Sequence, residues 1–417
     1  MAEEMHLMID ATILKNAAMK TPARSGIFFT VLALARAFSK RSDVKLYFSC
    51  KTSFIGQLKK AIRQELTEFK KIPIIPYEDN LYFFKYISYL QTLSPSFYKT
   101  YLWIRFLLRK IKSDFYLNKN LTPSVDVFFS PCHVIQTNIG RIQNILIYDT
   151  IPFIFPKYFE DIQNGTSWFL DLANYMKTNR NTHYFSISEQ TKKDFLKYVS
   201  QLRPEQITVT PLACHETFHP CSTEETLKSL KKYNLPTDKK YVFSLCSLDP
   251  RKNLIRAVKT FVEFIKKNNI DDMVFILGGG HWQDFIEKLN TEIKNLGDYK
   301  EKIIKAGYID DEDLAPLYSG AEWFVYTSQY EGFGLPPLEA MACGCPVITS
   351  NNSSLPEVVG NAGIMIDWNS DEQHVKAYED YYFHPELREQ NRQKGLARSK
   401  EFSWDKTVDL MIKEMIK

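Results

Sequence analysis

Apolar strands and amphipathic helices alternate along this 417-residue chain, and this order limits the fold more than any other feature. In the first half, short segments of strand type occur at 6–12, 45–49, 125–129, 144–148 and 183–188. After a polar stretch they recur at 241–247, 273–277, 303–306, 323–327, 347–350 and 364–366. Strands that alternate with helices form parallel sheets with helices on both faces. Two successive runs therefore predict an α/β protein with two parallel-sheet domains.

The boundary between these domains is expected where the chain turns polar and carries two prolines. We predict an N-terminal domain over 1–213, a linker over 214–240, a C-terminal domain over 241–400 and a C-terminal helix over 401–417. Ligands of open parallel sheets bind outside the carboxyl ends of the strands. With two domains facing each other, we expect the site in the cleft between them.

Charge and cysteine content exclude several classes of protein. The 53 Lys and Arg residues nearly balance the 49 Asp and Glu residues, and a net charge of +4 is too small for a dedicated nucleic-acid binder. Seven irregularly spaced cysteines indicate neither a disulfide framework nor a zinc site. The first residues do not read as a secretory signal, and no apolar run is long enough to span a membrane. We expect a cytoplasmic protein, which leaves room for a peripheral position on the inner face of a membrane.

The segment with the most chemical information follows the strand at 323–327. It runs through Glu331-Gly332-Phe333-Gly334-Leu335 and two prolines into a helix that carries Glu339. Prolines suit the first turn of a helix, and free amides at a glycine-rich helix start form a cradle for a phosphate. Glu331 and Glu339 could accept hydrogen bonds from sugar and ribose hydroxyls on either side of a diphosphate. As an isolated pair, they would more often be a solvated loop residue and a charge on a helix surface.

Two cations occupy an equivalent place after the strand at 241–247. Arg251 and Lys252 precede an amphipathic helix, so they lie at its N-terminus, where the helix dipole disfavours positive charge. Arginine offers a planar fork and lysine a compact point charge, and both suit phosphate oxygens. The unfavourable placement indicates an anionic ligand, although a solvated pair of charges would satisfy the sequence equally well.

Together these motifs resemble the family 4 retaining glycosyltransferases, which have the GT-B fold: two Rossmann-like parallel-sheet domains facing each other across a cleft. Glu331 and Glu339, with seven residues between them around Gly-Phe-Gly-Leu-Pro-Pro-Leu, are similar to the E-x7-E signature of that family. Four further segments resemble family motifs in the same order, the first two less specifically: 148–152, 209–212, 246–253 and 354–358.

The resemblance implies retaining transfer of a hexose from a nucleotide-diphosphate sugar to an acceptor hydroxyl, in surface polysaccharide or glycoconjugate biosynthesis. It implies no cofactor and no metal, with the donor as co-substrate. Arg251 and Lys252 would neutralise the leaving diphosphate, Glu331 would hold the sugar hydroxyls and Glu339 the ribose. The catalytic residues would thus be Glu331, Lys252 and Arg251, and the donor would contact Gly26, Arg251, Lys252, Glu331, Gly332, Phe333, Gly334, Leu335 and Glu339. The C-terminal helix would cross back to the first domain.

The first half of the chain offers two candidate residues for contact with the acceptor or the sugar, His133 and Asp149. His133 and Asp149 each follow a predicted strand and should face the cleft, although each would equally suit a satisfied polar residue at a strand end. Related enzymes often carry a His-Asp pair where this chain has Tyr148-Asp149, so direct transfer of that role is in doubt. Gly26, at a predicted helix start, fits close approach by a ligand or simple turn chemistry.

The segment 81–117 is rich in aromatic and basic residues. It suits contact with anionic lipid headgroups or a lipid-linked acceptor, or a buried core with a basic edge. The acceptor is therefore left open among a glycan, a lipid-linked glycan and a protein.

Three other functions fit the same architecture: a sugar phosphorylase, a nucleotide-sugar epimerase and a non-catalytic nucleotide-sugar-binding scaffold. A NAD-dependent enzyme is poorly supported, because no Gly-x-Gly-x-x-Gly follows a strand in a suitable βαβ unit.

Overall fold

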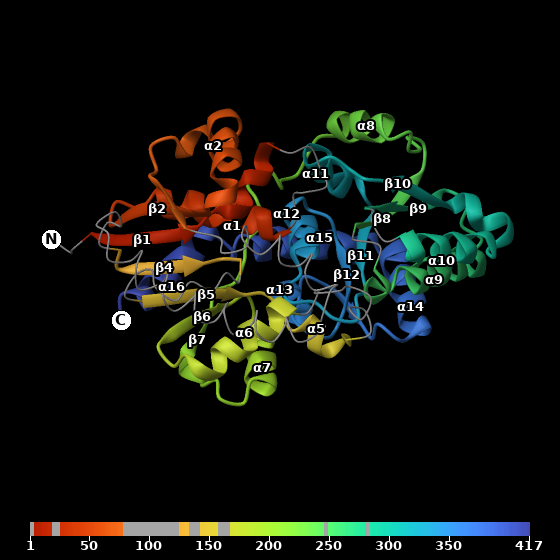
Figure 1. The fold of residues 1–417 in the computed structure, drawn as a ribbon. Helices are drawn as coiled ribbons and strands as arrows, with labels where there is room; N and C mark the ends of the chain where they lie inside the picture. Colours follow the sequence, from red (N-terminus) through yellow and green to blue (C-terminus); the bar gives the residue numbers. More distant parts are fainter. Residues whose placement is uncertain are drawn as a thin grey trace, which may run out of the picture.

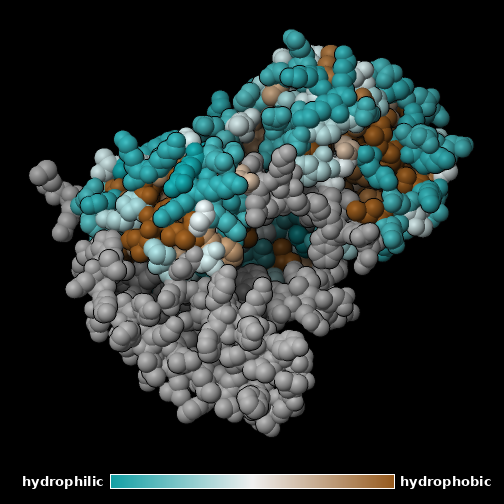
Figure 2. Space-filling model, turned by 45° about the horizontal axis from the view of Figure 1, so that its top comes forward, coloured by the Kyte–Doolittle hydropathy of each residue, from teal (hydrophilic) through white to brown (hydrophobic). Residues whose placement is uncertain are grey.

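Two sheets in which all strands run parallel organise the chain (Figure 1), as the alternation of strands and helices predicts. The structure is a computed structural model and describes residues 4–18, 26–77, 125–132, 142–156, 167–245, 249–279 and 283–417. A space-filling view shows a hollow between the two halves (Figure 2).

The first sheet has seven strands in the order β3-β2-β1-β4-β5-β6-β7. Its strands are β1 (Met5–Asp10), β2 (Val44–Lys51), β3 (Ile74–Tyr77), β4 (Val127–Ser130), β5 (Ile142–Ile147), β6 (Thr182–Ser186) and β7 (Ile207–Val209). The helices described with it are α1 (Gly26–Ser39), α2 (Ile55–Gln64), α5 (Ile151–Ile154), α6 (Ser167–Thr178) and α7 (Glu189–Tyr198). Leu7, Met8 and Ile9 of β1 are fully buried, as expected for a strand covered on both faces.

The second sheet has six strands in the order β10-β9-β8-β11-β12-β13. They are β8 (Lys240–Leu245), β9 (Met273–Gly278), β10 (Ile303–Gly307), β11 (Trp323–Tyr326), β12 (Val347–Ser350) and β13 (Gly363–Ile366). Its helices are α8 (Thr223–Lys232), α9 (Leu254–Lys267), α10 (Gln283–Lys294), α11 (Asp311–Gly320), α12 (Leu335–Ala342), α13 (Leu355–Val359), α14 (Asp371–Phe383), α15 (Pro385–Ser399) and α16 (Trp404–Met415). All six predicted strands of this half are present.

Two strands of the first sheet were not predicted, and both lie at its edges. β3 contains Pro76, which cannot donate a ladder hydrogen bond and is tolerated at a sheet edge. β7 has three residues, too few for a clear period-2 pattern. An edge strand pairs on one side only, so its sequence is less constrained than that of a central strand.

The polar segment 214–240 is only partly a connection between domains. It contains α8, which begins with a capping box between Ser222 and Glu225 and packs against α11. Asp313 of α11 accepts hydrogen bonds from Ser229 at 2.7 Å and from Tyr233 at 3.0 Å. The polar sequence therefore reflects a helix that covers the second domain with one face and meets solvent with the other.

The last helix, α16, returns to the first domain and packs against α1. Thr407 Oγ1 donates to the Pro211 carbonyl at 2.5 Å, and Arg41 forms an ion pair with Asp409 at 2.6 Å. Met411 and Met415 are fully buried in the core that this packing creates. In Figure 1 the C-terminus accordingly lies in the half formed by the first sheet.

Within the described ranges, no helix has both the length and the apolar character needed to cross a membrane. The large hydrophobic residues exposed there are few: Leu170, Tyr308, Phe383, Leu410 and Ile416. The segment 81–117, predicted to contact a membrane or a lipid-linked acceptor, lies outside the described residues.

The packing of α16 can be tested with two substitutions in adjacent positions. Met411→Ala should lower the free energy of unfolding by about 2–5 kcal/mol, because it leaves a cavity beneath α16. The matched change Leu410→Ala removes a side chain that is 42% exposed and should cost less than about 1 kcal/mol. Thermal and urea unfolding measure both. Equal losses in the two variants would contradict this position of α16.

Candidate functional site

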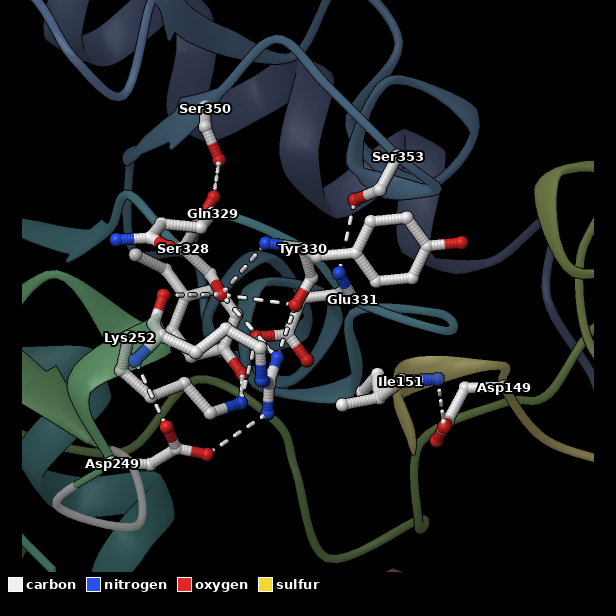
Figure 3. A network of polar contacts seen from close by, with 12 residues as sticks. Asp149, Ile151, Asp249, Lys252, Ser328, Gln329, Tyr330, Glu331, Ser350 and Ser353 are labelled. Atoms are coloured by element: carbon white, nitrogen blue, oxygen red, sulfur yellow. Dashed lines mark hydrogen bonds and ion pairs between the residues drawn. The ribbon is translucent and has the colours of Figure 1, made fainter. Parts of the chain in front are cut away.

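The predicted cationic and acidic motifs meet at the carboxyl ends of two neighbouring strands. The loop 249–253 follows β8 and the loop 327–334 follows β11, and β8 pairs directly with β11. Gln329 N donates to the Arg251 carbonyl at 2.8 Å, which ties the two loops together. Figure 3 shows side chains from both loops converging on one cluster.

The first loop is a tight turn held by its own residues. The Asp249 carboxylate accepts a hydrogen bond from Arg251 N at 2.8 Å and begins a short 3₁₀ turn, Pro250–Lys252. Asn253 then takes a left-handed conformation with φ 60°, which asparagine tolerates better than most residues, and α9 follows. The turn therefore presents Arg251 and Lys252 toward the second loop.

Glu331 pairs with both cations through one carboxylate oxygen. Its Oε1 lies 2.7 Å from Lys252 Nζ and 3.0 Å from Arg251 Nη1. The side chains of Arg251, Lys252 and Glu331 are 8%, 9% and 10% exposed, so water screens these charges weakly. Burial by itself would raise the pKa of Glu331, but the Lys252 and Arg251 charges outweigh burial and lower it to about 2.

Arg251 has additional partners that hold its guanidinium in place. It donates to the Tyr330 carbonyl, and its Nη2 lies 3.5 Å from the Asp249 carboxylate. Burial opposes its charge, whereas Glu331 and Asp249 favour it and raise the pKa of Arg251 further above its ordinary value. Arg251 and Glu331 are therefore both ionised throughout the physiological range.

Tyr326, which the sequence placed only in a strand, is a further member of the cluster. Its hydroxyl accepts a hydrogen bond from Lys252 Nζ at 2.6 Å, and the ammonium lies 5.0 Å from the ring centroid. Tyr326 is the last residue of β11 and almost fully buried. The sequence could have indicated this role, because a tyrosine at the carboxyl end of a central strand lies at the edge of the sheet where ligands bind.

The glycine-rich loop needs both of its glycines. Gly334 has φ 123°, a conformation that side chains disfavour, and a Cβ there would lie 2.8 Å from Leu355 Cδ2. A Cβ on Gly332 would lie 2.5 Å from the Tyr148 carbonyl oxygen of the first domain. Phe333 is buried and packs edge-on against Phe402. α12 begins at Leu335. Pro336 and Pro337 have no N–H, and Leu338 N donates to the Gly334 carbonyl at 3.3 Å, so within this first turn the Leu335 amide is the donor left for a ligand.

Glu339 lies in a different environment from Glu331. It is on α12 and accepts a hydrogen bond from the Tyr318 hydroxyl at 3.3 Å. Burial raises the pKa of Glu339 to about 7, against the opposing effect of the Tyr318 hydrogen bond. The two glutamates therefore differ in charge near neutral pH: Glu331 is ionised and Glu339 is at its midpoint.

Of the candidate residues in the first domain, Asp149 lies beside the cluster. Asp149 accepts a hydrogen bond from Ile151 N at 2.9 Å and lies close enough to the cluster for Arg251 and Glu331 to influence its charge. Burial is the largest effect on Asp149 and raises its pKa. Figure 3 shows Asp149 on the segment from the first domain beside the cluster. The Tyr148 hydroxyl instead donates to the Pro131 carbonyl at 2.8 Å, away from it.

The other two candidates are not joined to the cluster. Gly26 is the first residue of α1, and a Cβ there would meet no atom within 4 Å, so the packing of the described residues does not require glycine. His133 lies outside the described residues. The acidic run at 310–313 begins α11, where Asp313 joins α11 to α8.

Neutralising Glu331 tests whether the cluster depends on its carboxylate. Glu331→Gln leaves two buried cations without their shared partner and should lower the free energy of unfolding by about 3 kcal/mol at pH 7. The folded pKa is depressed, so this contribution is present above pH 4.5 and fades as the pH falls toward 2.

Urea unfolding at pH 7 and pH 3 measures the Glu331 effect, with Glu401→Gln as the control. Glu401 is 60% exposed and pairs with Arg398 at the surface, so its loss should cost less than about 1 kcal/mol. A Glu331→Gln protein as stable as the unchanged protein at pH 7 would contradict the ion pairing.

Glu339 should give the opposite result. Its pKa is raised in the folded protein, so the unfolded chain loses the proton first and stability falls as the pH rises from 4.5 to 7. Glu339→Gln should therefore increase stability at pH 8, by about 1–3 kcal/mol, and leave it nearly unchanged at pH 4. Melting temperatures at the two pH values measure the difference. A stabilisation that did not depend on pH would point to packing instead of charge.

Comparison with known proteins finds a family match in the second half of the chain. Residues 225–398 match the family model described as Glycosyl transferases group 1. O-antigen chain mannosyltransferase B of Escherichia coli is 37% identical over 202 residues, 48% of this chain and 52% of that protein. The serotype-specific mannosyltransferase WbdA of Escherichia coli is 28% identical over 272 residues, 64% of this chain and 32% of that protein. The chain thus spans about half of the first relative and a third of the second.

Solved structures match the chain over both domains. HepE of Anabaena, in complex with UDP and glucose, superposes with a TM-score of 0.68 at 15% identity and covers 100% of both chains. Sucrose-phosphate synthase of Thermosynechococcus elongatus gives 0.65 at 18% identity and 98% coverage of each. At sequence identities of 15% and 18%, these similarities establish the fold alone. The chain therefore has the two-domain GT-B fold, and its residues 225–398 match a glycosyltransferase group 1 domain.

Proposed function

We propose that this protein is a retaining glycosyltransferase that moves a hexose, with mannose as the first candidate, from a nucleoside-diphosphate sugar to an acceptor hydroxyl. The observation that carries the proposal is the buried cluster of Arg251, Lys252 and Glu331 beside the glycine-rich start of α12. Mannose is chosen because the curated relatives are named mannosyltransferases.

The cluster suits the difficult step, which is departure of the nucleoside diphosphate. The bond between the sugar C1 and the diphosphate oxygen breaks, C1 forms a bond to the acceptor oxygen on the same face, and the acceptor hydroxyl gives its proton to the departing diphosphate. Arg251 and Lys252 are held in place before reaction, so they can stabilise the charge that develops on the leaving group without reorganising. The Leu335 amide at the start of α12 adds a further donor. Two fixed cations could fulfil the role of a metal ion, so we propose that the reaction needs none.

Glu331 has two states in this scheme. Without donor it neutralises Arg251 and Lys252, and both cations bind the same oxygen, Oε1. A bound diphosphate would compete for these cations and leave Glu331 available to sugar hydroxyls. In the donor-free state, its low pKa of about 2 keeps Glu331 ionised. Glu339, further along α12, would hold the ribose. Asp149 would face the sugar or the acceptor from the first domain.

The acceptor is proposed to be a growing surface polysaccharide or another glycoconjugate, because the first relative is named an O-antigen chain mannosyltransferase. Membrane-surface contact through 81–117 and a peripheral cytoplasmic position remain predictions from the sequence.

The experiment measures release of nucleoside diphosphate from mannose and glucose donors in the presence of mannose oligosaccharides, with product anomers assigned by NMR. Lys252→Ala should lower kcat/KM by about tenfold to a thousandfold, because one preorganised charge is lost. The control Lys267→Ala, at the exposed end of α9, should leave it unchanged. A chelator should have no effect.

Three outcomes would contradict this function. Donor binding without diphosphate release under any condition would indicate a scaffold. Release that requires inorganic phosphate would indicate a phosphorylase, and an epimer formed without acceptor would indicate an epimerase.

A further inference from the structure

Helix α7 of the first domain holds the glycine-rich loop of the second domain by its backbone. Ser188, the N-cap of α7, donates from Oγ to the Gly332 carbonyl at 2.7 Å. Thr191 Oγ1 lies 3.1 Å from the same carbonyl and 2.9 Å from the Tyr148 carbonyl of its own domain. Ser188 and Thr191 are fully buried, so no solvent competes for these bonds. One threonine hydroxyl therefore joins the two domains at the loop.

The second domain in turn completes the N-terminus of α7. The Glu357 carboxylate, on α13, accepts hydrogen bonds from Glu189 N and Gln190 N, both at 2.7 Å. These are the first amides of α7, which have no intrahelical acceptor, and a carboxylate there is favoured by the helix dipole. Ser188 Oγ satisfies the next amide, that of Thr191, at 3.0 Å. The helix start is thus fully capped only when the two domains are together.

A third contact holds Tyr330, which precedes Glu331 in the chain as Gly332 follows it. The Tyr330 hydroxyl donates to the Asp194 carboxylate of α7, which also accepts from Gln190 Nε2 at 3.0 Å. Tyr330 and Gly332 flank Glu331 directly. Helix α7 therefore holds the loop on both sides of the carboxylate that pairs with Arg251 and Lys252.

We propose that Ser188, Thr191 and Asp194 are positioning residues, which hold Tyr330 and Gly332 and thereby set the position of Glu331 and of the phosphate cradle. Separation of the domains would remove these contacts and leave the loop held only from within the second domain, for example by the hydrogen bond from Glu331 N to Ser353 Oγ at 3.0 Å. Glycine at position 332 allows the two domains to approach this closely, because a Cβ there would collide with the Tyr148 carbonyl. The hydrogen bonds between the loop and Ser188, Thr191 and Asp194 are called the clamp below. The identity of the ligand rests on the proposed function, whereas the clamp exists whatever the loop binds.

Hydrogen exchange of the ligand-free protein tests the clamp independently of activity. Thr191→Val removes the bridging hydroxyl at nearly constant volume and should speed exchange of amides 329–334 by about threefold to tenfold. Thr191→Ser keeps the hydroxyl and should restore slow exchange. Ser188→Ala should also speed exchange in this loop. Ser370→Ala, which removes an equivalent cap from α14, should not. Unchanged exchange of the loop in folded Thr191→Val would overturn the proposal.

Turnover then tests whether the clamp positions the donor site. Thr191→Val should lower kcat/KM for the donor by about threefold to tenfold, with recovery in Thr191→Ser. Faster exchange with unchanged kcat/KM would overturn the positioning role. If the unchanged protein transfers no sugar, the proposed function fails, and the exchange result still decides whether the clamp exists.

Discussion

The pairing of Arg251 and Lys252 with Glu331 is the interaction on which the rest of the site depends. Charges that are about nine-tenths buried are costly unless each has a close partner. The cations come from the end of β8 and the carboxylate from the end of β11, so the pairing requires these strands to be neighbours. The sheet order provides this, because the second domain places β11 directly beside β8. The topology thus brings together residues about 80 positions apart and creates a site of defined charge.

The interface between the domains adds a second constraint on the same loop. Glu331 is held on its own side by the cations, while its neighbours Tyr330 and Gly332 are held by α7 of the first domain. The proposed catalytic group is therefore fixed from two directions by two domains. In this arrangement, domain closure and the geometry of the site are linked through hydrogen bonds to the Gly332 carbonyl and through the Tyr330 side chain.

Prediction from sequence was most successful where a pattern is local. Central strands are apolar over their whole length, and the glycines and prolines around Glu331 form a local pattern. The sequence therefore singled out Glu331, Arg251 and Lys252, which the structure brings together. Edge strands β3 and β7 were missed because pairing on one side relaxes their sequence. Helix α8 was taken for linker because its exposed face is polar. Tyr326, Ser188 and Thr191 were not identified as site residues, since their roles depend on partners 74 to 144 residues away.

The sequence by itself determined the alternation of elements, the two parallel-sheet domains and the chemical types of the site residues, because these follow from hydrophobic periodicity and short-range turn chemistry. Only the tertiary structure decided which charges meet, that Glu331 is ionised while Glu339 titrates near neutrality, and that the first domain holds the loop of the second. The physical reason is that pKa values and interdomain hydrogen bonds depend on burial and distance. Those quantities are set by packing between segments far apart in the chain.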